Sequence, residues 1–298
     1  MSIHKGKILE KVKGANVLDC SYCGFIHLDP IPLRRKVESL YQGKYYSKEK
    51  PLYIKRNIQD ETWWQSIFHD RLETINKYLE TNERKLLEFG SGPGLFLDYA
   101  QKKGWGVLGI EPAPIAFKYS LKRGVRVINA LVEDINIKEL GLFDCVALFE
   151  VLEHVAYAKK TLAIANKLLK AGGIICISIP NEYNPLQIVF KKSKNIKNYW
   201  LAPPLHINYF TNSSITKLLV KCGFKIVYRE ASFPMEFFLL MGDNYLGNDK
   251  LGRFMHGKRK KFDILLSKYN NPLKRNLYRS FAELGIGRSI TIYGRKVK

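Results

Sequence analysis

From Lys85 onward, short apolar runs alternate with amphipathic stretches along the chain. The apolar runs have the length of buried strands, and the amphipathic stretches carry apolar residues at the spacing of a helix. The predicted strands are 85–89, 106–110, 125–129, 143–148, 173–179, 225–231 and 289–297. The predicted helices are 95–103, 114–122, 157–170 and 213–222. Such alternation predicts an α/β fold with a mostly parallel sheet and helices on both faces.

Glycine follows most of the predicted helices, as is common where a helix is capped at its C-terminus. These glycines are Gly104, Gly124, Gly172–Gly173 and Gly223. Two runs, Cys145–Leu148 and Ile174–Ile179, are almost continuously apolar, which is typical of central strands buried on both sides. The pattern therefore predicts a doubly wound sheet of seven strands.

The last predicted strand follows a long excursion, because residues 232–288 are largely helical and basic. A strand that begins after such an excursion is expected to enter the sheet antiparallel to the others. The first 80 residues form a separate region with a Cys-containing segment and an amphipathic helix that ends near Leu79. We therefore predict an N-terminal extension (1–80) and a main domain (81–298) that carries a basic helical insert (232–288).

The segment 85–94 carries the first chemical signal, since glycine occupies positions 90, 92 and 94 between a predicted strand and a predicted helix. This pattern indicates a sharp turn whose backbone can touch a ligand, followed by a helix whose N-terminal amides face that ligand. Glu111 ends the next strand, 23 residues after Glu88. An acidic residue at about this place can reach the ribose hydroxyls of a bound nucleoside.

Two common nucleotide sites do not fit this turn. The dinucleotide fingerprint needs a small residue at its sixth position, where this chain has Leu95, so an NAD or FAD site is disfavoured. A phosphate-binding P-loop is excluded because no Gly-Lys-Ser/Thr sequence follows the glycines.

Four motifs in sequence order resemble those of the class I S-adenosylmethionine-dependent methyltransferases. They are the turn at 88–94, the acidic Glu111, the fourth-strand segment 143–154, and the segment 168–173 with its following strand. The resemblance covers residues 82–231 and implies a Rossmann-like, doubly wound, seven-stranded sheet whose last strand is antiparallel. The segment 206–211, followed by a helix and Cys-Gly-Phe, resembles the branch of quinone O-methyltransferases and sugar methyltransferases.

The resemblance implies S-adenosylmethionine as the cofactor, and the residues suit its chemistry. The positive end of the helix after Gly94 suits its carboxylate, Glu88 suits its ammonium group, and Glu111 suits its ribose diol. By resemblance, the segment 131–134 should edge the adenine. The expected cofactor-binding residues are Glu88, Phe89, Gly90, Ser91, Gly92, Gly94, Glu111, Pro112, Val132, Glu133, Phe149 and Glu150.

Carboxylate and imidazole groups gather at Glu150, Glu153 and His154. If this stretch opens a helix, the three side chains share one face and could bind a divalent metal or supply a general base. In the quinone O-methyltransferases that it resembles, a Glu-x-x-Glu-His pattern is associated with a divalent cation. The alternative, which we favour, is that Glu153 and His154 fix the loop by hydrogen bonds, so a divalent cation is not expected.

His206 follows the fifth predicted strand, on the side where substrates enter folds of this kind. A hydroxyl that attacks the methyl group must lose its proton near the transition state, and an imidazole titrates in a suitable range. His206 is therefore the first candidate for a substrate-side base, with His154 and Glu150 as further catalytic candidates. A structural role for His206 in orienting its loop is the alternative.

Cys20 and Cys23 have the spacing of a zinc knuckle, with His27 four residues further on. A structural zinc site needs four ligands, and His4 is the remaining candidate nearby. Two reduced cysteines in a turn are the alternative that we favour. The odd number of cysteines, five in all, and the absence of an apolar leader favour a reduced, cytoplasmic setting.

The net charge of +22 is uneven, because residues 251–298 contain 13 Lys or Arg against two acids. Such a field attracts anionic lipid headgroups or nucleic acid, so peripheral contact of 251–298 with the inner membrane face or RNA is predicted. A generally Lys-rich composition explains the charge equally well. No run reaches the roughly 18 apolar residues of a membrane-spanning helix.

The sequence thus predicts a methyltransferase that modifies a hydroxyl of a small molecule or of a glycan, including lipid-linked sugars. One alternative is an RNA methyltransferase that uses the basic C-terminal segment. The Asn/Asp-Pro-Pro-aromatic motif of base-amino methylases is replaced here by Phe149-Glu150-Val151, which argues against that subtype. The other alternative is a binding protein without catalytic activity on the same scaffold, although Glu88 and Glu111 are both retained.

Overall fold

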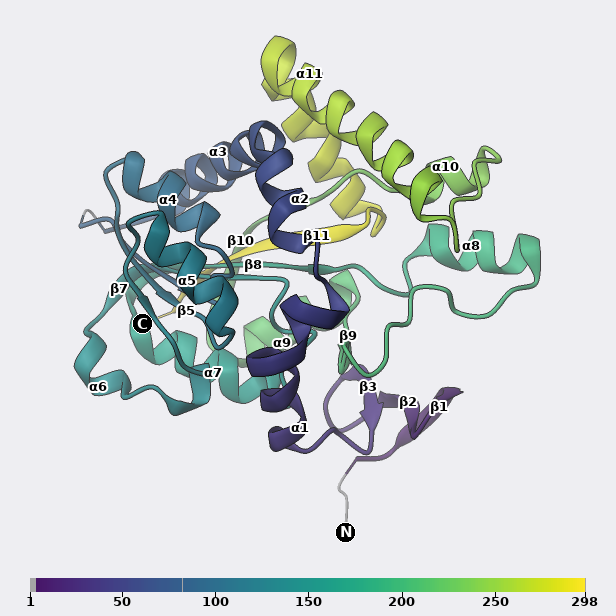
Figure 1. Cartoon of the computed structure of the whole chain (residues 1–298), viewed down its shortest axis with the longest axis horizontal. Coiled ribbons are helices and arrows are strands. Elements are labelled where there is room, and N and C mark those ends of the chain that lie inside the picture. Colours follow the sequence, from purple (N-terminus) through teal and green to yellow (C-terminus); the bar gives the residue numbers. More distant parts are fainter. Residues whose placement is uncertain (1–3, 82, 298) are drawn as a thin grey trace.

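The computed structural model describes residues 4–81 and 83–297, and a seven-stranded sheet forms its centre (Figure 1). The strands lie in the order β10-β11-β8-β7-β4-β5-β6. They are β4 (Lys85–Phe89), β5 (Gly106–Ile110), β6 (Val127–Ile128), β7 (Phe143–Phe149), β8 (Leu169–Pro180), β10 (Phe224–Ala231) and β11 (Ser289–Lys296). β11 runs antiparallel to both of its neighbours, and the pairs from β8 to β6 are parallel. The predicted fold class is confirmed.

The junction between α7 (Ala158–Leu168) and β8 differs from the prediction. The helix ends two residues early, and the strand begins at Leu169 instead of residue 173. Leu169 still pairs with Phe143, whereas the next partners are Cys145 and Ile174, so β8 bulges between these pairs. Gly172–Gly173 therefore belong to a bulge inside the strand and do not cap the helix.

Helices cover both faces of the sheet because successive residues of its central strands point to opposite sides. On one face, Leu86 and Cys145 pack against α3 (Glu61–Tyr78) and α4 (Leu95–Lys102). On the other face, Leu87 and Val146 pack in the core to which α7 and α9 (Asn212–Lys221) contribute. The remaining helical segments of the main domain are α5 (Pro114–Lys122), η2 (Val132–Asp134), α6 (Ile137–Leu140) and α8 (Pro185–Lys194).

The N-terminal region contributes a small sheet and a helical path that leads into α3. The antiparallel strands β1 (Gly6–Val12), β2 (Ala15–Cys20) and β3 (Phe25–Asp29) are extended by β9 (Asn208–Tyr209). After them come α1 (Arg34–Ser39), the π-helical segment η1 (Leu40–Glu49) and α2 (Tyr53–Gln59). Residues from both sides of position 80 thus share one sheet, and the domain boundary at that position stays a prediction.

The basic segment between β10 and β11 forms α10 (Glu236–Leu240) and the long α11 (Asp249–Glu283), which crosses the top of the molecule in Figure 1. α11 bends at Asn270, where the backbone leaves helical geometry two residues before Pro272. Buried ion pairs hold it to α3, because Lys274 Nζ lies 2.5 Å from Asp70 Oδ2. Among the described helices, none is long and apolar enough to cross a membrane.

We expect Lys274→Met to lower the free energy of unfolding by about 3 kcal/mol, because it removes the nearest cation of the buried Asp70 carboxylate and leaves only Arg275, at 3.9 Å, among the described cations. Urea unfolding measures the change. Lys268→Met is the matched control on an exposed part of the same helix and should cost less than about 0.5 kcal/mol. Equal losses in the two variants would contradict a structural role for the ion pair.

Candidate active site

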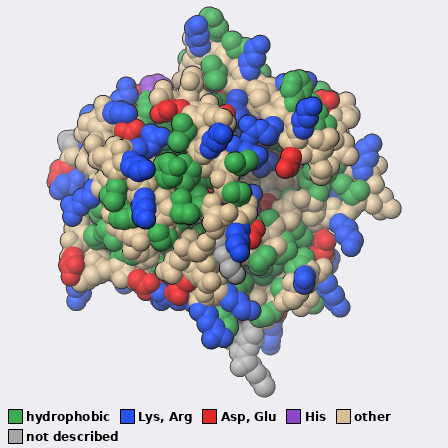
Figure 2. Space-filling view, in the orientation of Figure 1, with side chains coloured by type: hydrophobic (Ala, Val, Ile, Leu, Met, Phe, Trp, Pro, Cys, Tyr) green, Lys and Arg blue, Asp and Glu red, His purple; other side chains and the backbone are tan. Residues whose placement is uncertain are grey.

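A cavity of about 1260 Å³ opens at the carboxyl edge of the parallel strands. Its walls include the ends of β4, β7, β8 and β10, together with parts of η1, α2, α3 and α11. Figure 2 shows the surface hollowed between the α10–α11 segment and the N-terminal sheet. Doubly wound folds bind their ligands at this edge of the sheet.

The glycine turn between β4 and α4 forms one wall of the cavity. Gly92 has φ +53°, and a side chain there would meet only the Tyr46 hydroxyl, at 3.5 Å. Gly94 has φ +75°, and a Cβ atom there would lie 2.8 Å from Val125 Cγ2. Gly92 thus leaves the backbone open to a ligand, whereas Gly94 allows the start of α4 to approach the loop before β6 closely.

Two buried carboxylates flank the turn. Glu111 accepts hydrogen bonds from the backbone amides of Gly92 (2.7 Å) and Ala113 (2.8 Å). Burial nevertheless raises the pKa of Glu111 to about 7. At the end of β4, burial raises the pKa of Glu88 well above its usual range, and Glu88 Oε2 has no hydrogen-bond partner among the described residues. A cationic or hydrogen-bond-donating ligand would relieve both groups.

Ten of the twelve predicted cofactor-binding residues line the cavity. They are Glu88, Gly90, Ser91, Gly92, Glu111, Pro112, Val132, Glu133, Phe149 and Glu150. The other two do not line the cavity: Phe89 is fully buried in the core, and Gly94 packs against Val125. Glu150 has φ +55°, which is uncommon for a residue with a side chain and turns the chain sharply at the end of β7.

Sequence reasoning missed Arg71 of α3, which lines the same wall. Its guanidinium lies 3.9 Å from the centre of the Phe149 ring. Its positive charge also opposes the rise in the pKa of Glu88. Arg71 is buried, like Asp70 beside it, whereas Glu73 and Lys77 of the same helix are exposed, and only the folded helix reveals this position.

Aromatic residues from the N-terminal region line the cavity, and the prediction did not include them. They are Tyr41, Tyr45 and Tyr46 of η1 and Tyr53 of α2. The rings contact one another, with 5.1 Å between the centroids of Tyr41 and Tyr45 and 5.0 Å between those of Tyr45 and Tyr46. The available signal was the cluster of tyrosines in an otherwise polar stretch.

A histidine and a glutamate face each other at another part of the cavity wall. His206 Nδ1 lies 3.0 Å from Glu182 Oε1, and both residues line the cavity. The second oxygen of Glu182 has no partner among the described side chains and backbone groups. A carboxylate in this position holds the imidazole in one orientation and favours the tautomer with the proton on Nδ1. Glu182 was missed because no local pattern connects it with His206.

His154 lies beside His206, with 4.9 Å between the ring centroids. His154 Nδ1 lies 2.8 Å from the backbone oxygen of Leu205, and burial with the neighbouring His206 lowers the pKa of His154 to about 3. A group with this pKa is a weak base at neutral pH. The geometry therefore favours His206 over His154 as the proton acceptor.

The helix start considered for Glu150, Glu153 and His154 does not form, because residues 150–155 make a turn and the next helix begins at Ala158. Glu150, Glu153 and His154 therefore do not share a helix face. Instead, ligand atoms of Glu153, His154 and His206 lie within 4.8 Å of one another. Both carboxylate oxygens of Glu153 lack hydrogen-bond partners in the described structure, so this group could accept a cation.

Residues 63–229 match a protein family described as "Methyltransferase domain", and the match spans more than half of the chain. The chain belongs to this methyltransferase family. The ubiquinone biosynthesis O-methyltransferase of Saccharophagus degradans is 32% identical over 143 residues, which cover 43% of this chain and 60% of that protein. The protein of the same name from Xanthomonas axonopodis pv. citri is 34% identical over 118 residues, or 38% of this chain and 49% of that protein. This methyltransferase therefore spans about half the length of these curated relatives.

Solved structures agree with the family at the level of the fold. A SAM-dependent methyltransferase from Archaeoglobus fulgidus has a TM-score of 0.51 at 16% identity, covering 78% of this chain and 94% of its own. The plantazolicin methyltransferase BpumL, solved with a monoazolic desmethylPZN analog and SAH, has a TM-score of 0.55 at 13% identity, covering 89% and 97%. The predicted membership of the S-adenosylmethionine-dependent methyltransferases is confirmed.

We expect the ligand-free methyltransferase to lose stability as the pH rises. The unfolded chain releases the Glu111 proton near pH 4.5, whereas the folded chain keeps it until about pH 7. The protonated carboxyl group therefore stabilises the folded chain fully below the unfolded-state pKa of 4.5. This stabilisation, about 3 kcal/mol, is lost as the pH rises through the folded-state pKa of about 7. Urea unfolding between about pH 5 and pH 8 measures it.

Glu111→Gln removes this contribution and should flatten the pH dependence. Glu139→Gln, which replaces an exposed glutamate outside the cavity, is the matched control and should keep the slope of the unchanged chain. Identical slopes for all three proteins would contradict the assignment to Glu111.

Proposed function

We propose that this methyltransferase transfers the methyl group of S-adenosylmethionine to a hydroxyl oxygen of a small-molecule or glycan acceptor. The observation that carries the proposal is one cavity with two different ends. Two buried carboxylates beside an open glycine turn, Glu88 with one oxygen unpartnered and Glu111, form the first end, and the Glu182–His206 pair forms the second. The O-methyltransferase names of the curated relatives support the choice of oxygen as the acceptor atom.

The first end fits the charged groups of the cofactor. The orphaned Glu88 Oε2 would accept a hydrogen bond from the ammonium group, and the buried guanidinium of Arg71 would face the carboxylate. Glu111 would accept hydrogen bonds from the ribose hydroxyls, and Val132 and Glu133 would lie beside the adenine. The carboxylate was expected at the helix after Gly94, and Arg71 supplies a fuller positive charge for that group.

The second end fits a hydroxyl acceptor. The sulfonium of the bound cofactor supplies an already activated methyl group, so the protein needs mainly to align the acceptor and to remove a proton. With its Nδ1 proton held by Glu182, His206 presents Nε2 as the proton acceptor. Glu182 then stabilises the imidazolium that results. Glu150 and Glu153 lie near this pair, and burial raises the pKa of both carboxyl groups.

The tyrosines of η1 and α2 would exclude water from the reacting groups. Tyr45 lies over His154, with 6.3 Å between the ring centroids, and Tyr46 reaches toward Gly92. Exclusion of water strengthens the interaction of the carboxylates with a cationic ligand. The cavity volume of about 1260 Å³ exceeds the roughly 300–1000 Å³ of common ligand pockets, which leaves room for a cofactor and an acceptor together.

The basic segment 251–298 gives weaker support to a contact with an anionic membrane or RNA. Several of its cations serve inside the fold, since Lys260 pairs with Asp60, Lys274 with Asp70 and Arg275 with Glu230. Figure 2 shows Lys and Arg spread over the face in view, interleaved with hydrophobic side chains, and not gathered in one patch. A small-molecule acceptor is therefore favoured over RNA, and peripheral contact stays a prediction.

We expect Glu88→Gln to raise the Kd for S-adenosylmethionine about 10- to 100-fold, because a neutral amide replaces the acceptor of the ammonium group. Isothermal calorimetry measures the affinity, and circular dichroism checks the fold. Glu139→Gln serves again as the matched control outside the cavity and should leave Kd within about twofold. An unchanged Kd for Glu88→Gln would remove Glu88 from the cofactor site.

We expect His206→Asn to slow methyl transfer about 100-fold or more while the Kd for S-adenosylmethionine stays the same, because only proton removal is lost. Transfer of tritiated methyl groups to fractionated cell extract, and then to the acceptor recovered from it, measures the rate. His69→Asn replaces an exposed histidine outside the cavity and should keep full activity. Normal turnover of His206→Asn would exclude this residue as the base.

A further inference from the structure

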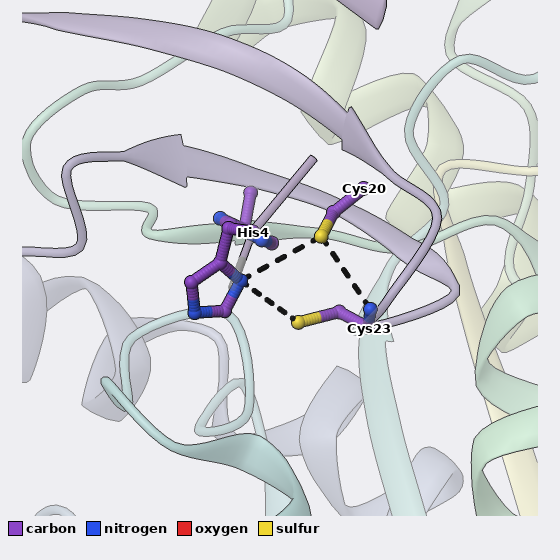
Figure 3. Close-up of side chains that lie close together, drawn as sticks. His4, Cys20 and Cys23 are labelled. Carbon is purple, nitrogen blue, oxygen red and sulfur yellow. Dashed lines mark hydrogen bonds between the residues drawn. The ribbon is translucent and has the colours of Figure 1, made fainter. Parts of the chain in front are cut away.

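A second cluster of potential ligands lies in the N-terminal sheet, apart from the cavity. His4, Cys20, Cys23 and His27 each offer one ligand atom, and these atoms all lie within 4.8 Å of one another. None of the four residues lines the large cavity. Figure 3 shows the His4 ring pointing to both sulfur atoms, with Nδ1 lying 3.6 Å from Cys20 Sγ and 3.4 Å from Cys23 Sγ.

The distances have the size expected of one tetrahedral zinc site. With Zn–S near 2.3 Å and Zn–N near 2.05 Å, the sulfur and nitrogen ligands of a tetrahedron lie about 3.6 Å apart. The two His4–cysteine distances match this edge length. The backbone amide of Cys23 also lies 3.4 Å from Cys20 Sγ, an arrangement in which a donor stabilises a thiolate.

His27 completes the set from the neighbouring strand. Its side chain is buried, Nδ1 lies 2.9 Å from the backbone oxygen of Leu28, and Nε2 has no hydrogen-bond partner among the described residues. The His27 and His4 rings are 4.7 Å apart. A histidine that donates one ring N–H to a backbone carbonyl and keeps the other nitrogen free is oriented as metal ligands usually are.

We propose that His4, Cys20, Cys23 and His27 bind one zinc ion in a closed structural site. Two sulfur and two nitrogen donors suit zinc, and carboxylates, which would suit magnesium or calcium, are not part of the cluster. Four protein ligands leave no coordination position for water or substrate, so the ion has a structural role. This proposal departs from the interpretation of two reduced cysteines in a turn, which is favoured from the sequence alone.

The site joins the start of the chain to the loop that carries His206. His27 pairs with Asn208 of β9, and the Leu28 amide donates to the Ile207 carbonyl over 2.8 Å. Asn208 Nδ2 in turn donates to the backbone oxygens of Leu152 and Val155, both at 2.8 Å. Metal binding at β2–β3 therefore stabilises the backbone on both sides of the histidine pair. This consequence for catalysis rests on the proposed function, whereas the metal site itself does not.

The first test measures the metal content of the purified 298-residue chain. Elemental analysis is expected to find about one zinc ion per chain. The zinc content of Cys23→Ser and of His27→Gln should each be at least about tenfold lower. Cys222→Ser removes a cysteine that is remote from the cluster and is the matched control, which should keep the zinc. Equal zinc in all four proteins, or none in the unchanged chain after zinc is added back, would overturn the site.

The second test uses the unchanged chain, so that it holds even where a variant fails to fold. Removal of metal by a chelator should lower Tm, and added Zn²⁺ should restore it. Added Co²⁺ should give the absorption of a four-coordinate ion with thiolate ligands, and a disulfide between Cys20 and Cys23 without any cobalt spectrum would contradict the proposal. The chelated chain should keep its Kd for S-adenosylmethionine and lose turnover. None of the metal or Tm measurements depends on methyl transfer, so they distinguish the failure of this site from the failure of the proposed activity.

Discussion

The constraint on which the site depends is the burial of the Glu88 and Glu111 carboxylates at the carboxyl edge of the sheet. Burial disfavours the charged form of each carboxyl group and raises its pKa. For Glu88 the free-energy cost is not offset at Oε2, which has no hydrogen-bond partner among the described residues. The central strand β4 fixes Glu88 by packing Leu86 and Leu87 into opposite faces of the core. A fold that buries carboxylates in this way gains affinity for a ligand with matching donors, at the expense of the stability of the ligand-free chain.

The fold after Lys85 could be predicted because its central strands are buried on both sides and its helices are amphipathic, which are local properties of the sequence. The prediction was wrong where pairing with distant residues decides the structure. The bulge around Gly172 exists because β8 keeps its pairing with Phe143 before it rejoins Cys145. The short strand β9 is defined by its pairing with β3, because two residues are too few to show the alternation of apolar and polar positions that predicts a strand.

The difference between local sequence patterns and contacts of distant residues also explains which parts of the site could be predicted. Glu88 and Glu111 were found because their spacing along the chain reflects one strand-turn-helix unit. Arg71 and Glu182 were missed because their partners lie on other elements, and the turn at 150–155 was mistaken for a possible helix start, since its charged residues have helical spacing. The spacing of Cys20 and Cys23 indicated a zinc knuckle, with His27 and His4 as further ligand candidates, as the less favoured alternative. Only the folded sheet shows that the ligand atoms of all four residues lie within 4.8 Å of one another.

The walls of the cavity have two origins, and this division bears on the choice of acceptor. The turn, Glu111 and the histidine pair belong to residues 63–229, which match the methyltransferase family. The tyrosines of η1 lie before this range, and α11 lies after it. α11 is joined to the matched range by buried polar contacts, including that of Trp63 Nε1 with Asp263 Oδ2 at 2.7 Å. Lys260 of α11 also pairs with Asp60, which lies before the matched range. Because the flanking segments line the cavity beside a shared cofactor end, we expect them to set which acceptor fits, so relatives that match mainly in the shared range can differ in their acceptors.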